Sequence, residues 1–245
     1  GAGAGGNGGF VETSSKGYLD FQGTVDLRAP AGESGTLLLD PSDITIAASP
    51  STVDVVVSGS GPFDFTAANA TSTLSTTALQ DQLALGNVTV STTSGASAPS
   101  GGTITVANAV SWGNSNVLRL EAEQGIAINA PITAAAGTLS LETANGEITQ
   151  SGGPVTAASV SAVASNGAVK LTDAANAIAL IAGRSNGGLG FTLVNSNGFS
   201  VGTVPGFGQV AAVNGIDSTN AFGYGVVLQA PGAGDITIAA PVNAG

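Results

Sequence analysis

The chain has 245 residues, of which only 9% are charged and 4% are aromatic, whereas 37 are glycine. It contains no cysteine and no histidine, which excludes disulfides, thiolate nucleophiles, Ser-His-Asp triads and metal sites built on these ligands. The net charge is −11, and the 5 basic residues are scattered along the sequence, so nucleic-acid binding through a basic cluster is excluded too.

The beginning of the chain carries no targeting signal that we can identify. Residues 1–9 lack both a basic n-region and an apolar h-region, so we expect no signal peptide there. No apolar run along the chain approaches the roughly 20 residues that span a bilayer, and we therefore expect no membrane insertion. The last residues, Pro241–Gly245, stop within a repeated motif, which indicates an interior fragment of a longer protein.

A repeated strand motif begins near residue 43. The hexapeptide Asp43–Ala48 (DITIAA) recurs identically at Asp235–Ala240. The related run Ile126–Ile132 recurs as Ile236–Val242, and the offset from 126 to 236 equals five units of 22 residues. Self-similarity at a fixed short period is the signature of repeat architectures, so we expect these runs to occupy equivalent places in a stack.

The segment Leu74–Gly86 interrupts this strand pattern and predicts a short helix near residues 75–85. Ser75 is a suitable N-cap, Leu79 and Leu83 lie one helical turn apart, and Gly86 is suited to end the helix.

Short runs of alternating apolar residues fill the stretch 117–181, each bounded by Gly, Asn, Ser or Pro, and such runs are typical of β-strands. Three columns of apolar residues recur there every 21 to 23 positions and are expected to point into a narrow core: Leu118, Leu139 and Val160; Ile126, Ile148 and Val169; Ile132, Val155 and Ile178. This spacing predicts a parallel β-solenoid in which each coil bonds to the next. With 22 residues per coil, 245 residues predict about eleven turns and a length of about 50 Å.

The main alternative to stacked coils is a β-sandwich, which also has short strands and tight turns. Sandwich cores usually contain more aromatic residues and do not repeat every 22 residues, so the solenoid is favoured. Asn129, Asn145 and Asn166 recur at the coil spacing, and we expect them to stack in hydrogen-bonded ladders at the corners.

The stretch 187–225 departs from the pattern and predicts an irregular insertion within an otherwise single domain, residues 1–245. It holds five aromatic residues: Phe191, Phe199, Phe207, Phe222 and Tyr224. Aromatic anchors carry much of the binding energy at interfaces, so Phe207, Phe222 and Tyr224 form the candidate binding surface. The alternative is that these rings fill a wider part of the core or cover its side.

Several segments resemble filamentous haemagglutinin-type exoproteins. They are Gly6–Ser14, Leu19–Asp20, Gly23–Asp26, Gly35–Ile46, Asn87–Val90, Ile104–Val106, Ala109–Trp112 and Ile126–Ile132. The resemblance implies a right-handed parallel β-helix, export by two-partner secretion through an outer-membrane transporter, and a role at the bacterial cell surface in adhesion, aggregation or biofilm. Some members of that family are stalks that carry toxins, and the family's own N-terminal secretion module is not recognised in this chain.

The sequence offers little for catalysis, and we expect no enzyme, no cofactor and no metal. The serious enzymatic alternative is a carbohydrate-active β-helix, which needs carboxylates gathered on one face. The nearest acidic groupings are Asp40 with Asp43 and Glu121 with Glu123, and both are more typical of a turn or a solvated face. Trp112 is expected in the core or as a cap rather than as a sugar platform. We therefore expect a secreted structural or adhesive fibre whose partner is a glycan or protein on a host or neighbouring cell.

Overall fold

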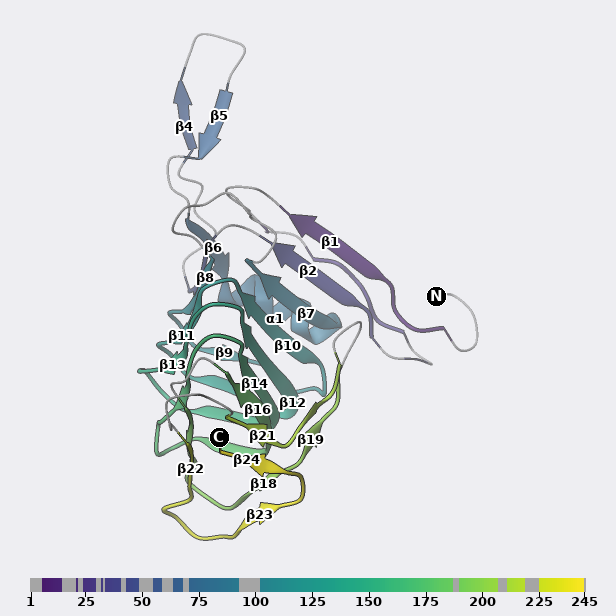
Figure 1. Ribbon diagram of the computed structural model, residues 1–245. Coiled ribbons are helices and arrows are strands. Elements are labelled where there is room, and N and C mark those ends of the chain that lie inside the picture. Colours follow the sequence, from purple (N-terminus) through teal and green to yellow (C-terminus); the bar gives the residue numbers. More distant parts are fainter. Residues whose placement is uncertain are drawn as a thin grey trace.

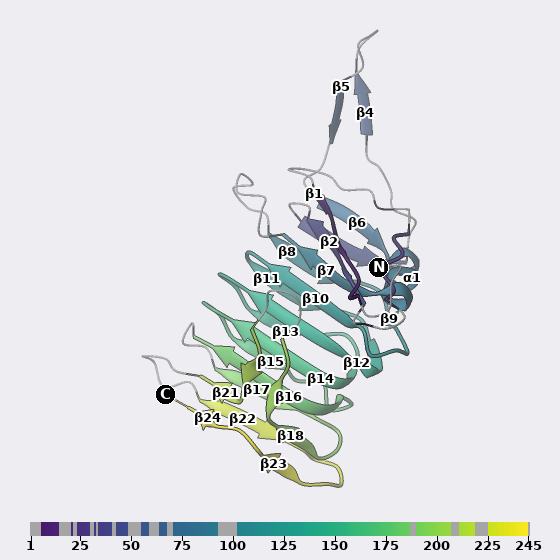
Figure 2. The same cartoon turned by 90° about the vertical axis from the view of Figure 1, so that its right-hand side faces the viewer.

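The chain is mostly β, with one short helix (Figure 1). A computed structural model describes residues 6–14, 21, 24–29, 32, 34–40, 43–48, 55–58, 64–67, 71–92, 102–186, 190–206, 211–218 and 225–244. Most of the described strands form two sheets, one of 12 strands and one of 8, whose strands all pair in parallel. The strands of each sheet lie side by side along one axis, from the N-terminal end to the C-terminal end (Figure 2).

The 12-stranded sheet follows a path of nine strands, with three short strands beside it. Its path is β1 (Phe10–Ser14), β2 (Thr36–Asp40), β7 (Asn87–Ser91), β10 (Val117–Ala122), β12 (Ile132–Thr143), β14 (Val155–Ala164), β16 (Ala177–Ser185), β18 (Phe199–Val201) and β23 (Ile236–Ile238). The short strands are β9 (Val110–Ser111), which pairs with β12, β21 (Ile216–Asp217), which pairs with β16, and β24 (Val242–Asn243), which pairs with β21.

The 8-stranded sheet has a single path. Its order is β22 (Val226–Gln229), β17 (Phe191–Val194), β15 (Val169–Leu171), β13 (Ile148–Gln150), β11 (Gly125–Ile128), β8 (Thr103–Val106), β3 (Asp43–Ala47) and β6 (Thr71–Ser75). Two antiparallel pairs complete the described strands: β4 (Val55–Ser58) with β5 (Asp64–Ala67), and β19 (Thr203–Val204) with β20 (Val213–Asn214). The β4–β5 hairpin projects away from the sheets in both views (Figures 1 and 2).

The register of the strands confirms the predicted spacing of about one repeat between neighbours. Leu118 pairs with Leu139, and Leu139 pairs with Val160; in the other sheet Ile126 pairs with Ile148. All nine residues predicted to point inward are at most 1% exposed. They belong to one continuous apolar cluster that both sheets share. Alternation then leaves the polar residues of each strand on the outward side, as in the β10 pattern of half-buried and buried positions.

The third predicted column differs in register by two residues. Ile132 pairs with Val155 as expected, but Ile178 pairs with Ala157. The position next to Val155 belongs instead to Asn176, whose Oδ1 accepts a hydrogen bond of 2.7 Å from the Val155 amide. Ile178 still points inward, because a shift of two residues keeps a side chain on the same side of a strand.

The two copies of the hexapeptide do not occupy equivalent places, so this part of the repeat prediction was wrong. Asp43–Ala47 forms β3 in the 8-stranded sheet, whereas Ile236–Ile238 forms β23 in the 12-stranded sheet. Both sheets bury one side of an alternating strand against the same core, so the same alternating sequence suits either of them.

The stack also has fewer layers than the eleven predicted. The two described paths contain nine and eight strands. Nine strands at about 4.8 Å per spacing give a stack about 38 Å long. Part of the difference lies in described residues outside the two paths, namely the β4–β5 hairpin, the helix and the β19–β20 pair.

The predicted helix is confirmed as α1 (Thr76–Leu85), with Ser75 at its N-cap and Gly86 at its C-cap. Leu79 and Leu83 are buried. Ser75 makes no side-chain cap bond, and the amide of Gly86 donates to the Gln82 carbonyl at 3.0 Å.

The helix covers the free edge of the short strand β9. The Ser111 amide donates a hydrogen bond of 2.8 Å to Gln80 Oε1, and the Ser111 hydroxyl donates to the same oxygen at 2.9 Å. Asn116 Nδ2 donates to the Leu83 carbonyl at 2.7 Å in the last helical turn. The helix therefore satisfies an edge that would otherwise be open to another strand.

One asparagine ladder runs along a corner of the stack, as predicted in part. Asn166 Nδ2 donates to Asn145 Oδ1 at 3.3 Å, and Asn145 Nδ2 donates to Glu123 Oε1 at 2.7 Å. Asn129 does not join them, because it lies on another corner and accepts a bond of 2.7 Å from Ser151.

A second amide ladder, which the sequence did not reveal, is buried inside the stack. Asn176 and Asn195 are at most 1% exposed. Asn176 exchanges two hydrogen bonds with the amide of Gln150, at 2.7 and 3.0 Å, and also donates to the Val194 carbonyl at 3.0 Å. These amides bond to backbone groups at a corner of the core, where strand pairing is interrupted.

Trp112, the only tryptophan, is 7% exposed and belongs to the core cluster, as predicted. Its indole Nε1 donates to the Asn116 carbonyl at 2.9 Å. Gly137 lies directly against this indole and leaves no room for a Cβ atom.

We expect Gly137→Val to displace the indole and to lower the free energy of unfolding by about 1–3 kcal/mol, because overpacking forces neighbouring groups to move. Tryptophan emission should shift to the red, and urea unfolding followed by circular dichroism should give the stability loss. Gly113→Val is the matched control, since no atom lies near its Cβ position. Unchanged emission in Gly137→Val would show that the indole does not pack there.

Candidate functional site

The three residues of the predicted binding surface, Phe207, Phe222 and Tyr224, lie outside the described residues. Phe191 and Phe199 from the same stretch are described, and both are buried, at 0% and 4% exposure. They belong to β17 and β18, and both rings are part of the buried apolar cluster. For these two rings, the alternative of core filling is the correct one.

Within 187–225, the described residues that leave the stack are those of the β19–β20 pair. The strand β18 ends at Val201 and β21 begins at Ile216, and both pair with the single strand β16. Gly202 and Gly215 hold the end of β18 next to the start of β21. The Gly215 amide donates to the Gly202 carbonyl at 2.8 Å, and the Gly183 amide on β16 donates to the Gly215 carbonyl at 2.8 Å. Gly215 has a φ of +70°, a conformation that favours glycine.

We call the described residues 203–206 and 211–214 the excursion, because they lie beyond the strand ends at Gly202 and Gly215. Its first strand, β19, contacts β14 and β16. Val204 on β19 is 1% exposed. On the outward side of β14, Ser159 and Ser161 are also buried, at 9% and 5%. The excursion therefore lies against the outward side of the 12-stranded sheet.

A cavity of about 460 Å³ lies between the returning part of the excursion and this sheet. Its polar lining comes from Glu142, Arg184, Asn214, Asp217 and Asn243, and small and apolar residues form the rest of its wall. Four of the polar residues lie in one outward column, because Glu142, Val163, Arg184, Asp217 and Asn243 are successive pairing partners on adjacent strands.

Ion pairs occupy the other described basic side chains. Arg119 contacts Glu121 at 2.5 Å and Glu142 at 2.6 Å, and Lys170 contacts Glu147 at 2.8 Å. Arg28 pairs with Asp26 at 2.7 Å, and the hydrogen bonds from this guanidinium lower the pKa of Asp26 from 3.8 to about 2.

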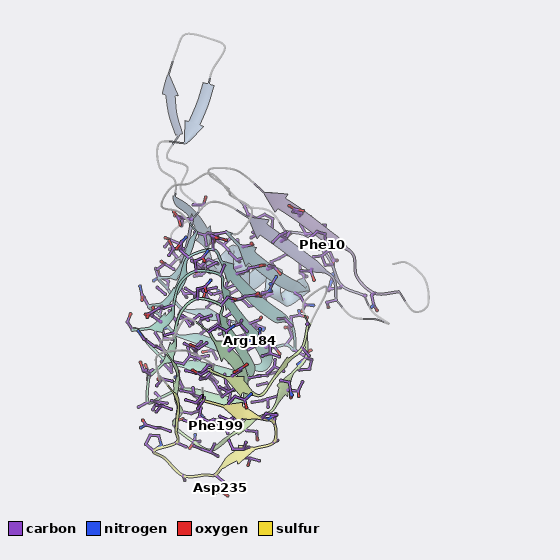
Figure 3. All side chains as sticks on the ribbon, viewed as in Figure 1. Phe10, Arg184, Phe199 and Asp235 are labelled. Atoms are coloured by element: carbon purple, nitrogen blue, oxygen red, sulfur yellow. The ribbon has the colours of Figure 1, made fainter. Side chains whose placement is uncertain are left out.

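Arg184 differs from these residues. It has an exposed side chain on β16 (Figure 3) and forms no ion pair or hydrogen bond with a described residue. Asp217 is its direct partner on the adjacent strand, yet the two charges do not pair. Oδ1 of Asp217 is buried without any hydrogen-bond donor. The cavity thus brings together a free guanidinium and a carboxylate oxygen that lacks a donor.

Of the acidic residues singled out from the sequence, the side chain of Asp40 lies outside the described ones, and Asp43, Glu121 and Glu123 have structural contacts. Asp43 Oδ1 accepts bonds from the amides of Gly102 and Thr103, both at 2.7 Å, and so clamps β3 to β8. Glu121 pairs with Arg119, and Glu123 accepts a bond from Asn145. In the part of the chain that the structure describes, no group of three or more acidic side chains is arranged to hold a metal ion.

The chain was compared with protein-family models, with curated proteins and with solved structures, and none of them matches it. Over the described ranges, no helix has the length and apolarity required to cross a membrane.

Proposed function

We propose that this chain is a segment of right-handed parallel β-solenoid from a large secreted or surface-exposed bacterial fibre protein, with a structural or adhesive role. The observation that supports this proposal is the parallel pairing of the described strands from β10 to β17 in both sheets, about one repeat per strand, with a register shift between Ala134 and Thr138 of β12. A stack of this kind is a rigid rod, and a rod is suited to hold a binding region away from a cell.

The connections between the sheets support the proposed solenoid and its handedness. Along the chain, β10, β11 and β12 alternate between the two sheets, and β12 returns to pair with β10. A chain that leaves a sheet and returns to a parallel neighbouring strand does so with a right-handed crossover in about 98% of cases. We therefore assign a right-handed coil of about 22 residues.

We propose the cellular location of this fibre protein from the resemblance of the chain to filamentous haemagglutinin-type exoproteins. In that setting an outer-membrane transporter exports the full-length protein, and the fibre contacts a glycan or protein on a host or neighbouring cell. The composition is compatible with an exposed location at the cell surface, because a net charge of −11 discourages association between β-rich rods. A second role, the stalk of a contact-dependent toxin, would use the same rod.

A carbohydrate-active enzyme is the competing proposal, and the geometry of the cavity argues against it. Glu142 and Asp217 lie three strands apart, which places their backbones about 14 Å from each other. Glycosidases hold their two carboxylates about 5–9.5 Å apart. Glu142 is also engaged by Arg119 in an ion pair of 2.6 Å.

Attachment and hydrolysis assays on the full chain distinguish these proposals. Beads coated with the chain should be retained on epithelial cells or on bacterial cells several-fold more than beads coated with an inert protein of similar acidity. A panel of plant and bacterial polysaccharides should release no new reducing ends. Retention equal to the control on both cell types would contradict the adhesive role, and release of reducing ends would favour the enzyme.

A further inference from the structure

The cavity beside the excursion has the features of a ligand-binding site. Of the described basic residues, Arg28, Arg119 and Lys170 are each paired with a carboxylate, and only Arg184 is not. A guanidinium beside a carboxylate usually forms a bidentate pair. Arg184 does not do so with Asp217, although the two residues are direct neighbours on β16 and β21.

These two groups define what a ligand must offer. The Arg184 guanidinium has only donors and calls for an anionic acceptor, whereas the Asp217 carboxylate has only acceptors and calls for a donor. An inorganic sulfate or phosphate would satisfy Arg184 but would offer Asp217 no donor at full ionisation. A neutral sugar would leave the guanidinium without its counter-charge. A sugar that carries a carboxylate beside its hydroxyl groups satisfies both residues.

The spacing of the column favours a sugar chain over a peptide. Arg184, Asp217 and Asn243 lie on consecutive strands, so their positions repeat about every 4.8 Å. A sugar chain advances by nearly this distance per pyranose unit. An extended peptide presents side chains to one face only every two residues, about 6.7 Å, and loses register with the strands.

We propose that this cavity binds a uronic acid residue of an acidic polysaccharide, with the ligand carboxylate on Arg184 and a neighbouring hydroxyl directed to Asp217. This inference rests on the proposed adhesive function and names the class of ligand that the fibre would hold. Small residues such as Ala211 and Ala212 leave room for the sugar ring.

The test is isothermal titration of the full chain with trimers of galacturonate, glucuronate and mannuronate, each beside its methyl ester. At least one free acid should bind about tenfold or more tightly than its ester, because charge-assisted hydrogen bonds are the stronger ones. Arg184→Gln should weaken that binding by about tenfold or more. Arg28→Gln is the matched control, since Arg28 is exposed and lies far from this cavity in sequence, and it should bind like the parent.

Three results would overturn the proposal: no binding of any of the three acids, equal binding of acids and esters, or an unchanged affinity in Arg184→Gln. Binding of a short peptide through its C-terminal carboxylate, without binding of the sugar acids, would overturn it as well. The cell-retention assay separates this failure from that of the proposed function. Beads that attach to cells without uronate binding would leave the adhesive role intact and remove only the ligand class.

Discussion

Val160→Asp is expected to lower the free energy of unfolding by about 4 kcal/mol or more, because it places an unpaired charge in a dry core. Val160 is 0% exposed and lies between Leu139 and Ile181 on the adjacent strands. Each of these neighbours is also 0% exposed, so water cannot reach the new carboxylate without separating the layers. Urea unfolding followed by circular dichroism measures the loss.

The matched control for this variant is Val163→Asp on the same strand. Val163 is half-buried on the outward side, between Glu142 and Arg184. The new carboxylate would remain hydrated next to a free guanidinium, and its cost should stay within about 0.5 kcal/mol. If both variants unfolded at the same urea concentration as the parent, the inward and outward assignment of β14 would be incorrect.

Asn176→Ala is expected to cost about 3 kcal/mol, because it leaves the Val155 amide without its partner in the interior and removes both hydrogen bonds between Asn176 and the Gln150 side chain. Removing one partner from a buried hydrogen-bonded pair is costlier than the bond itself is worth. Equilibrium unfolding in urea again gives the difference.

Asn145→Ala provides the comparison for the buried ladder. Asn145 bonds to Glu123 and Asn166 in a similar ladder, but it is exposed, so water replaces the lost bonds. We expect a loss of less than about 1 kcal/mol. Equal losses in the two variants would show that burial does not distinguish the two ladders.

The inward columns were predictable from sequence because burial imposes a strict pattern on short strands. Ile126, Ile148 and Val169 recur at nearly constant spacing and pair in the structure as expected. The helix was predictable for a similar reason, since Ser75 and Gly86 bound a segment with Leu79 and Leu83 on one side. Both predictions depend only on local periodicity and end signals.

Register across insertions was not predictable, because alternation fixes the side on which a residue points and not the sheet to which it belongs. Asp43–Ala47 and Ile236–Ile238 have the same alternation and lie in different sheets. The position of β3 between β6 and β8 in the sheet was also not predictable. In the chain β3 precedes both strands, and α1 and β7 separate β6 from β8.

The cavity could not have been found from the sequence, because its residues come together only through pairing between strands. Arg184 and Asp217 are separated by the excursion and become neighbours when β21 pairs with β16. In the sequence Arg184 is one of 5 scattered basic residues. The signal that marks it, the lack of a counter-charge, appears only when the pairs of Arg28, Arg119 and Lys170 are known.

The most direct test of the stacked parallel architecture is a set of distances along one outward column. One outward column of the 8-stranded sheet runs by successive pairing from Thr45 through Thr105, Ala127, Thr149, Lys170 and Thr192 to Val227, with one strand per step. The chain has no cysteine, so spin labels on introduced cysteines will report single pairs.

Double electron–electron resonance should therefore be measured between position 45 and positions 170, 192 and 227 in turn. These pairs are four, five and six strands apart, which predicts backbone separations of about 19, 24 and 29 Å. The labels add a similar offset to each pair, so the account predicts a regular increase of about 5 Å per strand. Distances that fail to rise in this order, as in a sandwich of antiparallel sheets, would contradict it.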